Sequence, residues 1–332
     1  MIIIDNKLEL MCNDFIKNRD ILRKDFTWEN PHIISNSSIM FLDSGKKLDE
    51  NRFIECDKII KENTSSFSNF RGMVKMPFIT SMVLSIDPLE KLNKSSAIYE
   101  ILKKYFSGSQ YIALGAIMLA DIVYPNNYEQ VACKAKSIYT QIRKIHPFLT
   151  SSEDITFCLL LASSDMSEER ILEETERCYN LLKPKFSSAN AVQALSHVLT
   201  LLEGTPEEKS QNTISLFNKL KEKGYKYGTG FEIPTLGLLA NLGNQGDNNI
   251  TQDELINKFE EVDTYLSNQK GYSGVFGVSK QQRYMHVSMI LNKYYNADNI
   301  GDISLLNSTL AIVIAEQIAI SIIVCATVVS NN

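Results

Sequence analysis

The sequence predicts an all-α protein built from about six αα-hairpins, and two observations indicate it. A large apolar residue near the end of a helix recurs about every 40 residues, which is the period of stacked helical hairpins. These residues are Ile60, Tyr99, Tyr139, Tyr179, Phe217 and, after a longer step, Tyr265. In addition, the sequence lacks the short alternating apolar and polar runs, bounded by hairpin turns, that would indicate a sheet.

The stretch from Arg177 to Gly204 shows the repeating unit most clearly. It is typical of a helix, a tight turn at 186–188 and a second, apolar helix. Phe186 follows Tyr179 by seven residues, and the same spacing separates Phe106 from Tyr99. Because these aromatic residues recur at the corner between two helices, we expect Phe106, Phe148 and Phe186 to pack between successive hairpins.

Taken in order, the chain begins with a predicted N-terminal helical cap over 1–50, followed by the αα-hairpin repeat array over 51–295. Within each hairpin the first helix is longer and charged, and the second is short and apolar. The second helices should therefore form the inner layer and the first helices the outer one. Helix starts are marked by capping patterns, namely Asp87-Pro88-Leu89-Glu90, Thr205-Pro206-Glu207-Glu208 and Thr251-Gln252-Asp253-Glu254.

Residues 296–332 are predicted to form a hydrophobic C-terminal helix, since 303–329 is nearly continuous Ile, Val, Leu and Ala. A stretch of about 20 such residues is long enough to span a bilayer. Glu316 and Gln317 oppose insertion, because an acid at the membrane centre costs about 2.5–3.5 kcal/mol. A helix that is apolar on all sides also suits burial in a core or a contact between copies of the chain. We favour burial or homo-oligomer formation, with membrane attachment as the alternative.

Composition narrows the classes of function. The 332 residues carry a net charge of −5, so no broad basic surface indicates nucleic acid, and no nucleic-acid partner is expected. Six cysteines and four histidines follow no metal-ligand spacing, so neither a metal nor a cofactor is expected. The N-terminus lacks the order of a secretion signal. We expect a cytoplasmic protein, with membrane association as the alternative.

Four segments resemble an uncharacterised bacterial family, the domain of unknown function numbered 4003. They are Phe70-Arg71-Gly72 with Lys75-Met76-Pro77, SANAVQALSHVL, KEKGYKYGTGFEIPTLGLLA and NQKGYSGVFGVSKQQRYMHVSMIL. The resemblance covers most of the chain and implies a shared architecture without a known activity. The hairpins are also similar to those of αα-toroid proteins, in which six hairpins close into a ring. Two alternatives for the array therefore stay open, an αα-toroid and an open α-superhelix.

Polar residues just past the corners are the candidates for a functional site, because the corners of a repeat protein lie on one rim. Asp154 and Glu232 are the two carboxylates that a closed ring would offer for acid–base work on a sugar. The simpler interpretation is that Asp154 and Asn190 cap the second helices locally. Six further residues are candidates for binding, namely Arg71, Asn190, Gln193, His197, Arg283 and His286.

These features leave the class of function open between three hypotheses. The leading one is a binding or scaffold module whose partner is a protein or a small polar ligand. The first alternative is an αα-toroid enzyme, a hydrolase or lyase acting on carbohydrate or a related small substrate. The second is a membrane-peripheral protein anchored by its C-terminal helix.

Overall fold

The computed structural model describes residues 4–27, 29, 31–230, 232–242, 250–272 and 278–296. Across these ranges the protein is helical, with fourteen α-helices, two short 3-10 helices and no β-strand. The all-α prediction is thus confirmed. The predicted C-terminal helix lies, beyond Asn296, outside the described residues. In the part of the chain that is described, no helix is both long and apolar enough to cross a membrane.

The chain forms two compact units. The central unit contains residues 18–172, and the terminal unit contains residues 1–17 and 173–332. The boundaries between them fall within α1 (Asn6–Asp25) and α9 (Glu168–Leu182).

The central unit contains three packed helix pairs, each made of a long first helix and a shorter second one. The pairs are α3 (Glu50–Asn63) with α4 (Lys75–Leu84), α5 (Pro88–Leu102) with α6 (Gln110–Ile122), and α7 (Tyr128–Ile145) with α8 (Asp154–Ser163). Helix α2 (Pro31–Ser44) packs on α4, and two 3-10 helices, η1 (Asn69–Arg71) and η2 (Pro125–Asn127), lie in the connections. In α4 and α8 every residue over 76–83 and 154–162 is buried, whereas the first helices bury one face.

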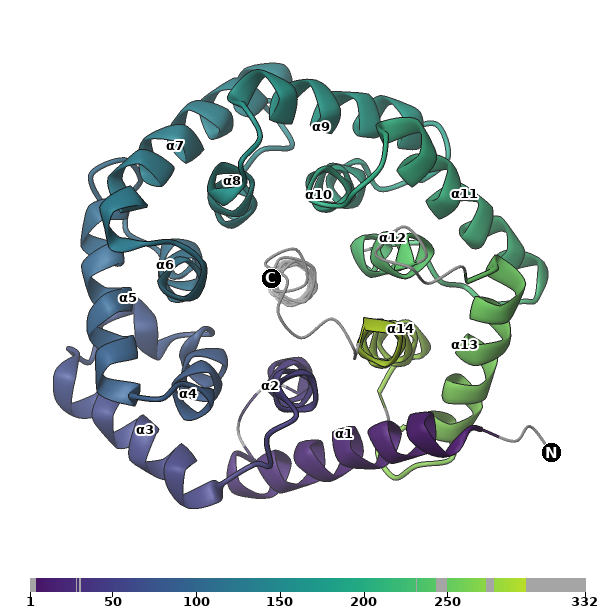
Figure 1. Ribbon diagram of the computed structural model, residues 1–332, viewed down its shortest axis with the longest axis horizontal. Coiled ribbons are helices and arrows are strands. Elements are labelled where there is room, and N and C mark those ends of the chain that lie inside the picture. Colours follow the sequence, from purple (N-terminus) through teal and green to yellow (C-terminus); the bar gives the residue numbers. More distant parts are fainter. Residues whose placement is uncertain are drawn as a thin grey trace, which may run out of the picture. The chain divides into compact units, whose positions relative to one another are not determined.

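The terminal unit continues the same alternation. Its helices are the end of α9, α10 (Ala189–Thr200), α11 (Pro206–Glu222), α12 (Ile233–Ala240), α13 (Gln252–Ser267) and α14 (Lys280–Asn296). Helix α12 packs against α10, α11 and α14, and α13 packs against α14. Helices α10, α12 and α14 therefore stand side by side, with α11 and α13 along one side of them (Figure 1).

The first residues of the chain belong to the terminal unit because they pack on its last helix pair. The carboxylate of Asp5 lies 2.9 Å from the Lys258 ammonium, and the Tyr265 hydroxyl donates to Asn13 at 2.6 Å. The Phe15 ring lies 5.4 Å from the His286 ring. The start of α1 is thus held by α13 and α14, some 250 residues further along the sequence.

Corner aromatics pack against the first helix of the following pair at two of the three predicted positions. Phe106 lies 5.9 Å from Tyr139, and Phe186 lies 4.9 Å from Phe217. The prediction for Phe148 is wrong, because its side chain is 97% exposed. Phe148 follows Tyr139 by nine residues rather than seven, so it departs from the spacing of the other two corners.

Glycines allow the second helices to approach one another closely. A Cβ added at Gly237 of α12 would lie 2.2 Å from the Leu195 side chain of α10. A Cβ added at Gly115 of α6 would lie 2.3 Å from the Leu159 side chain of α8. A side chain at either position would displace the leucine that it meets, so the two glycines keep these helices close, as the small residues in the predicted second helices indicate.

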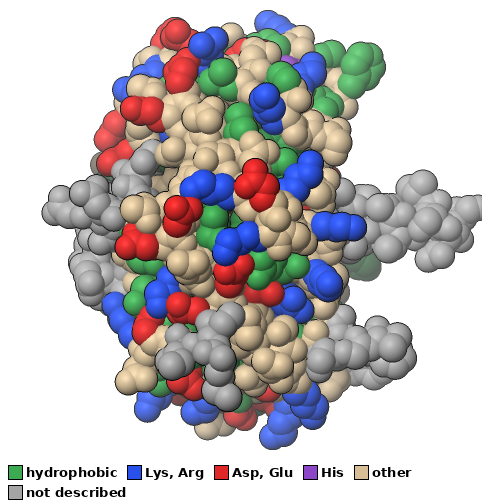
Figure 2. All heavy atoms as spheres, turned by 90° about the vertical axis from the view of Figure 1, so that its right-hand side faces the viewer, with side chains coloured by type: hydrophobic (Ala, Val, Ile, Leu, Met, Phe, Trp, Pro, Cys, Tyr) green, Lys and Arg blue, Asp and Glu red, His purple; other side chains and the backbone are tan. Residues whose placement is uncertain are grey.

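The solvent face over α11 and α13 carries acidic and basic side chains interspersed with each other (Figure 2). Two ion pairs join these helices, Lys219 with Asp253 at 2.7 Å and Lys223 with Glu260 at 2.8 Å. Solvent screens exposed ion pairs of this kind. This face therefore keeps the protein solvated and adds little to its stability.

Candidate functional site

The corners, the segments that lead from a first helix into its second helix, contain most of the residues that the sequence singles out. In the central unit they are 64–74, 103–109 and 146–153. In the terminal unit they are 183–188, 223–232 and 268–279, of which 231 and 273–277 are outside the described residues. Each unit thus contains three of these corners.

Arg71 closes the first corner of the central unit. Its guanidinium donates to the Thr64 carbonyl at 2.5 Å, to the Thr64 hydroxyl at 2.9 Å and to the carbonyl of Lys61. These carbonyls belong to the C-terminal end of α3, where a cation is favourable because the helix dipole leaves negative partial charge there. Arg71, a predicted binding residue, thus caps the C-terminal end of α3.

Asp154 opens α8, and its side chain is 8% exposed. Burial raises the pKa of its carboxyl to about 7, although the Ser151 N–H, which donates to Oδ2 at 2.8 Å, favours the charged form. Burial also raises the pKa of the neighbouring Glu153, against a hydrogen bond from Tyr111. The Asp154 carboxyl therefore binds the backbone of its own corner, and it keeps its proton up to about neutral pH.

Glu232 plays a similar local part at the corner between α11 and α12 of the terminal unit. It is 1% exposed, and its Oε1 accepts hydrogen bonds from the Gly228 N–H at 3.1 Å and the Thr229 N–H at 2.9 Å. Gly228 has a φ of +87°, and a Cβ there would lie 2.6 Å from Leu236. The carboxylate therefore fixes a glycine-dependent turn.

The same corner begins with a glycine that ends α11. Gly224 has a φ of +88°, and the Tyr225 N–H reaches back to the Leu220 carbonyl at 2.9 Å. This is the hydrogen-bond pattern of a helix that terminates at a left-handed glycine. The segment Lys221–Gly230, which mixes basic and aromatic residues, is thus a helix stop followed by a long corner.

Arg283 and His286 lie on α14 and are both buried. The Arg283 guanidinium pairs with both carboxylate oxygens of Asp263 on α13, at 2.6 and 3.3 Å. Against the desolvation that burial brings, this pairing raises the pKa of Arg283. The His286 Nδ1 lies 2.7 Å from the Tyr272 hydroxyl. These two contacts join α14 to α13 and to the corner between them.

A buried hydroxyl network lies beside this pair of helices. The Tyr227 hydroxyl, on a fully buried side chain, lies 2.7 Å from the Thr235 hydroxyl of α12 and 2.6 Å from the Ser288 hydroxyl of α14. The Tyr227 ring also stacks on the Phe259 ring and meets the Tyr284 ring edge-on. Such satisfied networks rigidify a core and specify one arrangement of its helices.

The three candidates on α10 differ in exposure. Asn190 is exposed, and the cap of this helix is Ser188, whose hydroxyl accepts from the Ala191 N–H. Gln193 is 2% exposed and His197 is fully buried. One helical turn apart on the same helix, these two side chains share a face, as the sequence predicts.

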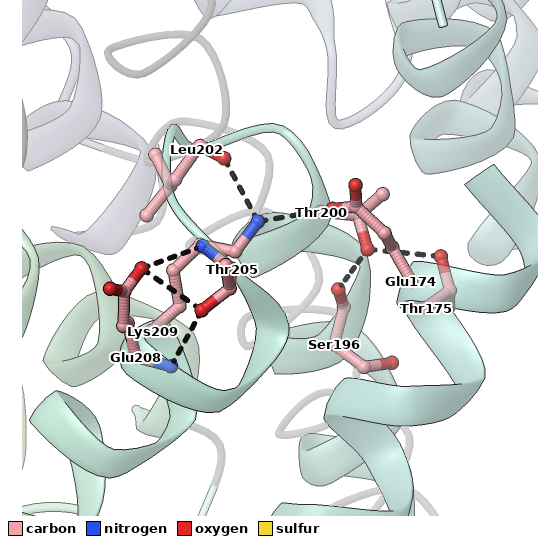
Figure 3. Close-up of polar contacts among 8 residues, drawn as sticks. All are labelled: Glu174, Thr175, Ser196, Thr200, Leu202, Thr205, Glu208 and Lys209. Carbon is pink, nitrogen blue, oxygen red and sulfur yellow. Dashed lines mark hydrogen bonds and ion pairs between the residues drawn. The ribbon is translucent and has the colours of Figure 1, made fainter. Parts of the chain in front are cut away.

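The sequence did not single out two buried lysines at equivalent positions. The Lys91 ammonium donates to the Ile117 carbonyl at 2.7 Å and pairs with Asp121 at 2.5 Å. The Lys209 ammonium donates to the Leu202 carbonyl at 2.9 Å and pairs with Glu174 at 3.2 Å (Figure 3). A signal for them exists, because each is the fourth residue after a helix cap in the shared pattern Pro-x-Glu-Lys.

The buried charged residues described above bind helix ends, turns and neighbouring helices, so they stabilise the fold. Among the described residues, no group of three or more His, Cys, Asp and Glu side chains could hold a metal ion. The fold and these contacts define a class of all-helical proteins in which paired helices are joined by glycine-dependent and charge-capped corners.

Comparison with known proteins places the chain more narrowly. It belongs to a family described as "Protein of unknown function (DUF4003)", whose model matches residues 18–319. The chain is also similar to the "Uncharacterized protein YeaA" of Bacillus subtilis (strain 168), with 24% identity over 229 residues, 66% of this chain and 68% of that protein. No solved structure matches the chain.

The structural part played by Glu232 can be measured. We expect Glu232→Gln to lower the free energy of unfolding by about 1–2 kcal/mol, because an amide accepts the Gly228 and Thr229 N–H groups more weakly than a carboxylate does. Urea denaturation would measure this effect, with Glu203→Gln at an exposed position as the control. Equal midpoints for the two variants would contradict the assignment.

Proposed function

We propose that the protein is a binding or scaffold module made of repeated αα-hairpins. The observation that carries this proposal is the distribution of exposed apolar side chains. Of the eight large ones in the described residues, all except Leu10 belong to the central unit. They are Ile54, Phe67, Ile86, Leu89, Tyr124, Ile145 and Phe148. Apolar side chains that one unit of a protein leaves in water are available to contact a partner.

The engagement of the polar corner residues supports the same proposal. The charged groups of three corner candidates, Arg71, Glu232 and Arg283, already bind backbone groups or a neighbouring helix. These contacts make the corners rigid. A rigid surface binds with a smaller loss of conformational freedom than a mobile one. Recognition would then rest on the exposed side chains that these corners present.

We further propose that the hairpins continue as one repeat array that closes into a ring. Support comes from the terminal unit, where the start of α1 packs on α13 and α14 through Asp5, Asn13 and Phe15. Contact between the first helix and the last pair is what a closed αα-toroid requires and an open superhelix lacks. A closed ring would supply the rigidity that the binding function uses.

Photo-crosslinking in the host cell tests the binding function. A benzoyl-phenylalanine at position 67, 86 or 148 of the full chain should give a discrete adduct with a binding partner. The same group at Glu203, an exposed position in the terminal unit, should give none. Absence of adducts at all three apolar positions would contradict the proposal.

One observation favours the enzyme alternative, a hydrolase or lyase acting on carbohydrate. A general acid must hold its proton near neutral pH, and burial raises the pKa of Asp154 to about 7. In that case Asp154→Asn should abolish the release of reducing sugar from oligosaccharides, with Asp165→Asn as the matched control. Wild-type protein that releases no sugar from a panel of such substrates would remove this alternative.

A further inference from the structure

The three corners of the central unit lie at one end of its second helices. The Met73 N–H donates to the Gln110 side chain at 3.2 Å, which joins the start of α4 to the start of α6. The Thr156 hydroxyl donates to the Tyr111 carbonyl at 3.1 Å, which joins the start of α6 to that of α8. The corner segments that lead into these three helices therefore share one surface, here called the corner face.

Two phenylalanines of the corner face are almost completely exposed, Phe67 at 99% and Phe148 at 97%. Their neighbours Phe70 and Phe106, in corners of the same unit, are buried and pack on tyrosines of α5 and α7. Phe70 and Phe106 therefore pack in the core, whereas Phe67 and Phe148 are exposed to water. A fully exposed phenylalanine gains the most from an apolar environment, which the protein itself does not provide here.

Charge is polarised along the first helices of this unit. Helices α3 and α7 begin with an acid in the first turn, Glu50 and Glu129, and end with bases in the last turn. The helix dipole explains this arrangement, which places Lys61, Arg143 and Lys144 beside the corners. Acids lie there too, because Lys103 and Lys104, in the corner after α5, pair with Glu100 and Glu129.

Arg143 and Lys144, at the end of α7, are exposed and take part in none of the ion pairs among the described residues. They immediately precede Ile145, which is 51% exposed, and stand within five residues of Phe148. The strongest apolar protrusion of the corner face is therefore flanked by two uncompensated positive charges.

From this combination we propose that the corner face docks on an anionic phospholipid surface, with Phe67 and Phe148 inserted among the acyl chains and Arg143 and Lys144 against the headgroup phosphates. The proposal rests on the proposed binding function and names its partner. Apolar insertion combined with basic side chains is the chemistry that holds peripheral proteins at anionic membranes.

The exposure of the two phenylalanines distinguishes a membrane from a protein partner. A protein interface needs a complementary surface packed as densely as a protein interior. Two rings on separate corners, each surrounded by solvent, supply little of such a surface. A fluid bilayer needs no shape complementarity, because it deforms around each inserted ring.

Vesicle co-sedimentation of the full chain tests the proposal, using phosphatidylcholine vesicles with and without 30% phosphatidylglycerol. We expect the wild type to bind the anionic vesicles and to be released by salt. The double variant Phe67→Ala/Phe148→Ala should bind about 100-fold more weakly, about tenfold for each ring removed. Arg143→Gln/Lys144→Gln should weaken binding to the anionic vesicles about 20-fold and remove most of the salt dependence.

The control is Leu10→Ala, because this side chain is 61% exposed and belongs to the terminal unit, outside the corner face. All variants keep residues 297–332, so any contribution of that segment is common to them. Binding that is equal in the phenylalanine and control variants would overturn the proposal.

A second readout separates this proposal from the binding function. If the wild type fails to bind anionic vesicles while a crosslinker at Phe148 captures a protein, the membrane proposal is overturned and the binding function stands. If neither vesicles nor proteins are bound, both fail. The substituted side chains contribute no packing, so all variants should melt as the wild type does, and a lower melting temperature would show that the corner face is part of the core.

Discussion

Replacing Phe186 by alanine is expected to lower the free energy of unfolding by about 3–5 kcal/mol, the usual cost of removing a buried aromatic side chain. Phe186 is 8% exposed and lies 4.9 Å from Phe217 on the first helix of the next pair. The substitution removes both the buried area and the ring contact, and it leaves a cavity between α11 and the corner. Guanidinium denaturation of the full chain would measure the loss.

The chain supplies a matched control at the corresponding corner. Phe148→Ala makes the same chemical change at a side chain that is 97% exposed, so it should alter stability by less than about 0.5 kcal/mol. The comparison separates packing from any general effect of losing an aromatic residue at a corner. If the two variants unfold at the same denaturant concentration, corner aromatics do not hold successive helix pairs together.

The helix starts and stops could be predicted because they depend on residues close together in sequence. Thr205 with Glu208 and Thr251 with Glu254 form complete capping boxes, and Asp87 caps α5. Each of these contacts spans three residues or fewer, so the sequence contains both partners in one pattern. The glycine stop of α11 could be predicted for the same reason.

The partners of the buried charges could not be predicted, because they come from other helices. Arg283 was singled out as a binding residue, but nothing near it in sequence indicates Asp263, twenty residues earlier on α13. Lys209 likewise depends on Glu174, thirty-five residues away on α9. Whether a charged side chain binds a ligand or a neighbouring helix is decided by tertiary packing, and one sequence does not contain that information.

Exposure was the other property that the sequence could not give. Phe106, Phe148 and Phe186 occupy corresponding corners, yet only Phe148 is in solvent. Its corner differs by two residues in the spacing from the preceding tyrosine, but spacing alone does not decide exposure. Phe67 follows Ile60 by seven residues, as Phe106 follows Tyr99, and Phe67 is 99% exposed.

Asp154 makes the stability of the protein dependent on pH, in the direction opposite to that of a salt-bridged acid. Its pKa is raised by burial from the ordinary 3.8 to about 7 in the folded state. Between these values the folded protein keeps the proton while the unfolded chain releases it, so the folded state binds more protons. Stability is therefore fully present below about pH 4 and is lost as the pH rises toward 7.

At 1.36 kcal/mol per pKa unit, this difference corresponds to a loss of up to about 4 kcal/mol between pH 4 and pH 8. Asp154→Asn keeps an oxygen that accepts the Ser151 N–H but has no proton to release, so we expect the variant to be more stable than the wild type at pH 8 and equal to it near pH 4. Burial also raises the pKa of Glu153, so part of the slope should remain in the variant. The measurement is urea denaturation at four pH values, with Asp165→Asn, an exposed position after α8, as the control that should follow the wild type. Curves for Asp154→Asn and wild type that run parallel over this range would show that the Asp154 carboxyl ionises as freely in the folded protein as in the unfolded chain.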